Sequence, residues 1–134
     1  MATVTSNKVS AGTQPKGLRV GLVATSATFS ANGSMSNGDV VQMVKVPQNS
    51  QVVYLWTGYQ LTGVGSITIG DGVSAARYLA ATVASAGVGP FSAMPAALVP
   101  YTYSTDDTID VTVSMSVNVS SGAIYMVAVL NLDP

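Results

Sequence analysis

Ile-Asp-Val-Thr-Val-Ser-Met-Ser-Val-Asn-Val, residues 109–119, is the stretch that decides the fold. Apolar residues take every odd position and polar residues every even one, which indicates a β-strand with one face in the core and one in water. Residues 120–122 supply a turn, and residues 123–132 return as a second strand that is apolar on both faces up to Asn131. We therefore expect a long antiparallel hairpin. A strand without a polar face needs cover on both sides, from a second sheet, an arm or a neighbouring chain, which is a first indication of assembly.

Shorter patterns predict six further strands and no helix. Residues 84–97 hold two glycines and two prolines without a period, so we expect a long surface loop there. Pro100 confines the last of the six strands to a sheet edge, because proline cannot donate a ladder hydrogen bond. The six strands are residues 18–31, with a bend near 24–26, and residues 39–46, 51–61, 66–69, 77–82 and 98–104.

The strand at 51–61 is again apolar on both faces. We expect one face to carry Val53, Leu55, Tyr59 and Leu61, and the other to carry Val52, Tyr54 and Trp56. With the hairpin, about eight short antiparallel strands divide between two sheets. The predicted fold class is therefore all-β, an antiparallel β-sandwich of jelly-roll topology.

The composition is far from that of an average globular protein. Hydrophobic residues make up 48% and charged residues only 8% of the 134 residues, against about a quarter charged in typical domains. A protein with so few charges has little with which to stay dispersed. We infer that much of the surface is shared with partners or covered by Ser, Thr, Asn and Gln.

The charges also argue against several kinds of partner. The net charge is −1 and the basic residues are scattered, which disfavours nucleic-acid binding. No apolar run reaches the roughly 18 residues of a membrane helix, and the polar N-terminus does not resemble a signal peptide, so we expect the mature chain to start at or near Met1. The absence of cysteine removes disulfides and thiolate metal sites. The five basic residues are Lys8, Lys16, Arg19, Lys45 and Arg77.

Residues 1–17 are predicted to form an N-terminal arm, and residues 18–134 a single sandwich domain. The arm is rich in Thr, Ser, Asn, Gly and Pro and shows no apolar period. It could be pinned on a neighbouring chain or folded back on its own sheet.

No constellation of residues predicts catalysis or a cofactor. Without His or Cys the common general bases and thiol nucleophiles are missing, and all six carboxylates are Asp. Asp106, Asp107 and Asp110 are the best candidates for a metal site, with a turn and a solvated strand start as the alternative. Residues 70–72 (Gly-Asp-Gly) lack the helix and lysine of a phosphate loop, so we expect a tight turn in which the Asp side chain bonds its own backbone.

Two pairs of aromatic residues share a strand face. These are Tyr54 with Trp56, and Tyr101 with Tyr103. Tyr and Trp are favoured at protein interfaces and as sugar-stacking platforms, and they also serve in ordinary core packing. All three interpretations stay open for both pairs.

Several segments together resemble a known family. These are the N-terminal arm, residues 40–50 (Val-Val-Gln-Met-Val-Lys-Val-Pro-Gln-Asn-Ser), residues 67–72 (Ile-Thr-Ile-Gly-Asp-Gly) and residues 76–79 (Ala-Arg-Tyr-Leu). They resemble the cement or decoration proteins of tailed bacteriophages, including the jelly-roll cement protein of a Bordetella phage. The resemblance covers residues 18–82.

The resemblance implies a structural protein of the virion. Such a protein is made in the host cytoplasm, binds the outer surface of the capsid as a dimer or higher oligomer, and bridges neighbouring major capsid subunits. From their chemistry alone we expect the partner interface to involve Lys8, Lys16 and Arg19 and the Tyr101–Tyr103 edge. The alternative function is a carbohydrate-binding sandwich, such as a head-fibre or receptor-binding tip.

Overall fold

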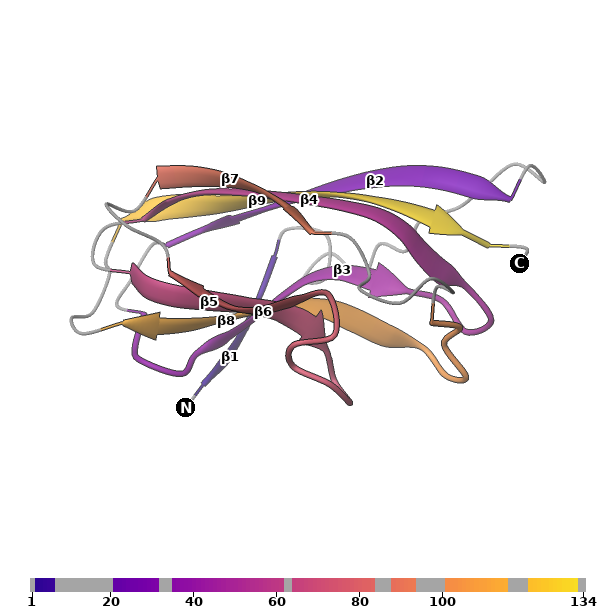
Figure 1. Ribbon diagram of the computed structural model, residues 1–134, viewed down its shortest axis with the longest axis horizontal. Coiled ribbons are helices and arrows are strands. Elements are labelled where there is room, and N and C mark those ends of the chain that lie inside the picture. Colours follow the sequence, from indigo (N-terminus) through magenta and orange to yellow (C-terminus); the bar gives the residue numbers. More distant parts are fainter. Residues whose placement is uncertain are drawn as a thin grey trace.

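The chain folds as two packed β-sheets (Figure 1). A computed structural model describes residues 2–6, 21–31, 35–61, 64–83, 88–93, 101–115 and 121–132. No helix long and apolar enough to cross a membrane occurs in this part of the chain. Its nine strands are β1 (Thr3–Thr5), β2 (Leu22–Ser30), β3 (Val40–Val46), β4 (Gln51–Leu61), β5 (Val64–Asp71), β6 (Leu79–Val83), β7 (Val88–Ala93), β8 (Asp107–Met115) and β9 (Gly122–Asn131).

The topology is that of a jelly roll. One sheet has the order β2-β9-β4-β7, and the other has β3-β8-β5-β6 with β1 added beside β3. Consecutive strands from β2 to β9 change sheets at every step except β5 to β6. Apart from β1, which is parallel to β3, all pairs are antiparallel. The predicted antiparallel sandwich is therefore confirmed.

The predicted hairpin at the C-terminal end is wrong. β8 pairs with β3 and β5, whereas β9 pairs with β2 and β4, so the two strands lie in opposite sheets. Alternation identifies a half-buried strand but not its partner, and a jelly roll separates neighbours in sequence between two layers. Residues 116–119 of the predicted strand lie outside the described residues. Gly122 begins β9 with φ +116°, and a Cβ there would lie 2.0 Å from the carbonyl oxygen of Gln60.

Two other segments differ from expectation. The predicted loop at 84–97 contains strand β7, which pairs with β4 at the edge of its sheet. Its glycine and proline hide the strand pattern, and an edge position tolerates Pro90. In the predicted strand at 98–104, residues 101–104 form only an isolated bridge between Gln51 and Thr102.

A β-bulge in β4 changes which residues share a face. The pairing with β9 shifts between Val52 and Tyr54, so Val52 joins Leu55 in the core, and both are fully buried. The prediction that Val52 shares a face with Tyr54 and Trp56 is therefore wrong, because an extra residue inverts the alternation. Tyr54 and Trp56 remain together on the outer face.

The core lies between the two sheets and is built from alternate residues of the central strands. The predicted core face of β8 is confirmed where the structure describes it, since Ile109, Val111 and Val113 are buried, but Asp110 on the face expected in water is buried as well. β9 faces them from the other sheet with Ile124, Met126, Ala128 and Leu130.

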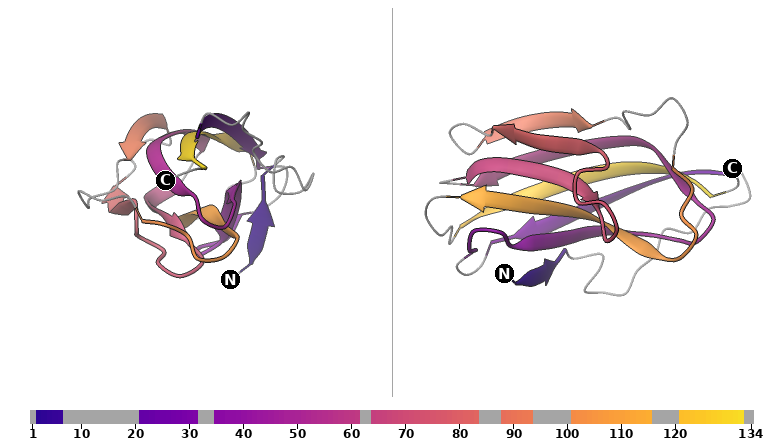
Figure 2. Two further views of the ribbon diagram at one scale, coloured as in Figure 1. Left: turned by 90° about the vertical axis from the view of Figure 1, so that its right-hand side faces the viewer. Right: turned by 60° about the horizontal axis from the view of Figure 1, so that its bottom comes forward.

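The beginning of the predicted arm lies on the chain's own sheet. Figure 2 shows β1 at the margin of the sandwich. The backbone N–H of Val40 donates to the carbonyl of Ala2 at 3.0 Å, and that of Ser6 to the carbonyl of Gln42 at 2.7 Å. Residues 7–17, the rest of the arm, are outside the described residues.

Candidate functional site

The outer face of the β2-β9-β4-β7 sheet carries an exposed apolar patch that no described residue of the chain covers. Four of the six large hydrophobic side chains exposed in the described residues lie on it, with exposed fractions of 59% for Leu22, 39% for Tyr54, 45% for Tyr125 and 36% for Val127. Trp56 and Val129 are half-buried between them. We call these six residues, Leu22, Tyr54, Trp56, Tyr125, Val127 and Val129, the apolar face.

The strand register brings the apolar face together. Val127 of β9 pairs with Trp56 of β4, and Val129 pairs with Tyr54. Tyr125 pairs with Gly58, and a Cβ at Gly58 would lie 2.6 Å from Cη2 of Trp56. The indole therefore lies along β4 above Gly58, next to the position of Tyr125. None of the four strands of this sheet contains a charged residue.

The outer face of the opposite sheet is polar. Lys45 pairs with Thr108, and Gln42 with Asp110, across β3 and β8. A polar outer face is what an antiparallel sheet shows when water covers it. The two outer faces therefore differ in character, and contiguous exposed apolar patches are typical of interaction sites.

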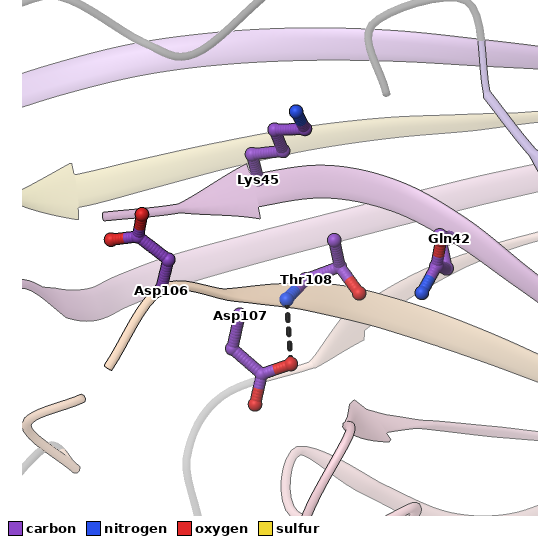
Figure 3. Close-up of a pocket in the computed structure, with 5 residues that line it drawn as sticks. All are labelled: Gln42, Lys45, Asp106, Asp107 and Thr108. Atoms are coloured by element: carbon purple, nitrogen blue, oxygen red, sulfur yellow. Dashed lines mark hydrogen bonds between the residues drawn. The ribbon is translucent and has the colours of Figure 1, made fainter. Parts of the chain in front are cut away.

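A shallow depression of about 340 Å³ lies over the polar sheet, lined by Gln42, Lys45, Asp106, Asp107 and Thr108 (Figure 3). The carboxylates of Asp106 and Asp107 point in different directions there. Asp106 accepts from the backbone N–H of Gln48 at 2.7 Å, and Asp107 from that of Thr108 at 2.7 Å. Within the described residues no three acidic side chains are placed to hold a metal ion.

Asp110, the third metal candidate, is buried on the same sheet. It is 7% exposed and accepts a hydrogen bond from Oγ1 of Thr108 at 2.6 Å. Burial raises the pKa of Asp110 to about 6, and the neighbouring carboxylates of Asp107 and Asp71 raise it as well. Its contacts are those of a structural residue.

The expected Asp turn at residues 70–72 is confirmed. Oδ1 of Asp71 accepts from the backbone N–H groups of Val73 at 3.0 Å and Ser74 at 2.7 Å. Its other oxygen pairs with Arg77 and accepts from the hydroxyl of Tyr103 at 2.9 Å. Burial alone would raise the pKa of Asp71, but these hydrogen bonds lower it below the ordinary value. Asp71 thus ties the β5–β6 connection to the segment before β8.

The two tyrosines of the predicted edge have different environments. Tyr103 is 2% exposed, and its hydroxyl lies 2.5 Å from that of Tyr78. Burial raises the pKa of both phenols, that of Tyr78 to about 12, so both stay protonated and able to donate. Tyr101 is 37% exposed, with the guanidinium carbon of Arg77 3.7 Å from its ring centroid. Neither tyrosine belongs to the apolar face.

The predicted interface residues and the apolar face are thus different sets. Lys8, Lys16 and Arg19 lie outside the described residues. The sequence carries a signal for the apolar face, since the strands at 51–61 and 123–132 are both apolar on two sides. The pattern predicts that Tyr54 and Trp56 share a face, but it does not predict the bulge that separates them from Val52.

Comparisons with known proteins concern the fold. No protein-family model and no curated protein sequence matches the chain. A chain in the capsid of Ralstonia phage GP4 superimposes with a TM-score of 0.76 at 12% identity, covering 98% of this chain and 99% of that one. The chain has the fold of this capsid component.

Two further solved structures have similar chains. One, in the capsid asymmetric unit of cyanophage Pam1, gives a TM-score of 0.66 at 15% identity over 88% of this chain and 91% of that one. The other, in the acidic stable capsid of Helicobacter pylori bacteriophage KHP30, gives 0.57 at 13% identity over 84% and 89%.

Proposed function

We propose that the chain is a structural protein of a phage virion that binds the outer surface of the capsid and holds neighbouring major capsid subunits together. The observation that carries this proposal is the apolar face, a charge-free sheet surface that no described residue covers. The similarity of the fold to chains in phage capsids, over 84–98% of this chain, supports it.

The apolar face has the chemistry of a protein interface. Interface centres are depleted in charge and enriched in Tyr and Trp, which offer apolar area with a polar tip. Burying such a surface stabilises a complex by about 25 cal/mol for each Å² of apolar area removed from water. A specific contact of on the order of 1,000 Å² or more, repeated in many copies on a lattice, gives tight attachment without any charged pair.

The proposed partner is the major capsid protein, and the proposed location is the exterior of the virion. The N-terminal arm, with Lys8, Lys16 and the nearby Arg19, is proposed to make secondary contacts to a neighbouring subunit, and exposed Tyr101 another. No chemical step is part of this function, and we propose a role without enzymatic activity.

The test is a binding assay on capsids prepared without this chain. Wild-type protein is expected to bind to saturation, whereas a variant with a charge in the centre of the apolar face, Val127→Lys, is expected to stay in solution. Thr112→Lys, which alters the outer face of the opposite sheet, is the matched control. Equal binding of Val127→Lys and wild type would overturn the proposal that this face holds the capsid.

A carbohydrate-binding role is the second candidate, because Tyr54, Trp56 and Tyr125 expose or half-expose aromatic rings on one surface. Sugars stack on such rings, and Trp56 is the only tryptophan. Hits on a glycan array, together with a change in Trp56 fluorescence on adding the same sugar, would support this function. A silent array and unchanged fluorescence would exclude the sugars tested.

A further inference from the structure

The connection between β5 and β6 carries an apolar tip, residues 72–76 (Gly-Val-Ser-Ala-Ala). The side chain of Val73 is 81% exposed, the largest fraction among the exposed large hydrophobic residues that the structure describes. Ala75 and Ala76 are exposed as well, and the tip contains no charged residue. Exposed connections are usually polar, so a run of exposed apolar side chains indicates a contact surface.

Hydrogen bonds hold the tip in one conformation. Oδ1 of Asp71 accepts from the backbone N–H groups of Val73 and Ser74. The backbone N–H of Asp71 donates to the carbonyl of Ser74 at 2.9 Å, and a Cβ at Gly70 would lie 2.1 Å from that carbonyl oxygen. The chain therefore folds back tightly on itself. A contact surface that is ordered before binding loses less conformational entropy when a partner arrives.

Tyr101 is positioned through the same carboxylate. Arg77 pairs with Asp71, and its guanidinium carbon lies 3.7 Å from the ring centroid of Tyr101. Among the described residues, Val73 and Tyr101 are the two exposed large hydrophobic side chains that lie outside the apolar face. We call residues 72–76 together with Tyr101 the tip surface.

The tip surface and the apolar face lie on different sides of the molecule. In Figure 1 the β2-β9-β4-β7 sheet forms the upper layer, and the connection between β5 and β6 protrudes below the lower layer. The apolar face is the outer side of the upper layer. A flat partner that covers the apolar face therefore leaves the tip surface free for another contact.

We infer that the tip surface binds a second major capsid subunit, next to the one that the apolar face binds. This inference rests on the proposed function, because a chain that holds two subunits together needs a contact to each of them. Two contacts made by one rigid chain also reinforce each other, since the second forms at high effective concentration once the first is made.

The residues beside the tip indicate the chemistry of the partner. The backbone N–H of Gly72 donates to Oδ1 of Asp107 at 3.2 Å, and Asp107 follows the exposed Asp106 in the chain. Within the part of the chain that the structure describes, the ion pair formed is that of Arg77 with Asp71, and Asp106 and Asp107 have no cationic partner. The complementary surface is an apolar pocket for Val73 with Lys or Arg at its rim.

Val73→Asp tests the second contact on capsids prepared without this chain. The apolar face is unchanged, so the variant is expected to cover the capsids at saturating concentration, with an affinity at least about tenfold lower. Wild-type protein is expected to raise the temperature at which the capsids come apart, followed by light scattering, and Val73→Asp is expected to lose this gain. Ser114→Asp, exposed near the far end of β8, is the matched control and should keep it.

The outcomes separate this inference from the proposed function. Equal stabilisation by Val73→Asp and wild type would overturn the second contact and leave the role of the apolar face intact. Wild-type protein that does not bind capsids would overturn the proposed function and this inference together. Circular dichroism is expected to show that Val73→Asp is folded, because the side chain is 81% exposed.

Photo-cross-linking counts the subunits that one copy of the chain contacts. The chain has no cysteine, so Gln60→Cys, exposed on β4, and Val73→Cys can each carry a photoreactive maleimide. Each single variant is expected to give a product with one major capsid subunit, and the double variant a product with two, by mass on a denaturing gel. Ser114→Cys, the control, is expected to give none. A double variant that yields only the product with one subunit, or a cross-link from position 73 to another copy of this chain, would overturn the inference.

Discussion

The indole of Trp56 occupies the space that a side chain at Gly58 would need. A Cβ at Gly58 would lie 2.6 Å from Cη2 and 3.2 Å from Cζ3 of Trp56. Glycine at this position lets the ring lie against the sheet, so the apolar face is flatter than its residue types alone would make it.

Gly58→Ala is expected to displace the indole, because the tip of a side chain can move more easily than the backbone. We expect the emission of Trp56, the only tryptophan, to shift to longer wavelength and its quenching by acrylamide to increase. The change in unfolding free energy should stay below about 1.5 kcal/mol. Gln60→Ala, two residues further along β4, is the control and should leave the emission unchanged. Unaltered emission in Gly58→Ala would contradict the position of the ring.

Val127→Lys is expected to weaken capsid binding at least about tenfold, which corresponds to about 1.4 kcal/mol. A lysine in the centre of an apolar contact loses its water without gaining a partner charge. The fold should persist, since Val127 is 36% exposed and points away from the core. Binding isotherms on capsids measure the loss of affinity, and circular dichroism shows whether the variant is still folded. Loss of the fold together with binding would show that the residue acts in stability.

Asp71→Asn is expected to destabilise the protein by about 2–4 kcal/mol, since it removes a buried charge and leaves Arg77 without its partner. The pKa of Asp71 is lowered in the folded state, so the stability that it contributes is present above its ordinary pKa and is lost as the pH falls through the lowered value. Urea unfolding at pH 7 measures the cost. Asp106→Asn, on an exposed residue, should change stability by less than about 0.5 kcal/mol. Equal effects of the two substitutions would contradict the role of Asp71.

Asp110 has the opposite pH dependence. Its pKa in the folded state is about 6, above the ordinary value for an Asp carboxyl, so between these two values the folded protein binds more protons than the unfolded chain. Stability should therefore fall as the pH rises from about 4 to about 6, by on the order of 2–3 kcal/mol. Asp110→Asn mimics the protonated side chain and should remove this slope while stabilising the protein at pH 7–8. A slope that persists in Asp110→Asn would assign the effect to another group.

Burial was easier to predict from this sequence than strand partners. The alternation of residues 109–113 predicts the buried apolar face correctly, because side-chain direction in a strand follows directly from the backbone. The partner of β8 was not predictable from adjacent residues, since the jelly roll pairs it with β3 and β5 from distant parts of the chain. The bulge in β4 moves Val52 to the opposite face from the one predicted, because one extra residue interrupts the alternation.

The sequence predicts that two strands need a second packing partner, but it does not predict which residues form the exposed surface. Two strands apolar on both faces require a second partner, and the structure leaves the outer side of β4 and β9 exposed. The predicted interface residues rest on residue type alone, and on that basis Tyr103 and Tyr101 belong to the same edge. Burial and the hydrogen bond to Asp71 separate them, and both depend on tertiary packing that residue type does not encode.

The number of copies of this chain per major capsid subunit in purified particles tests the central claim most directly. Quantitative mass spectrometry with isotope-labelled peptides from both proteins gives this ratio. We expect the ratio to be a simple fraction set by the capsid lattice, because a cementing protein binds every equivalent site. A chain missing from the particles, or present in only a handful of copies, would contradict a cementing role.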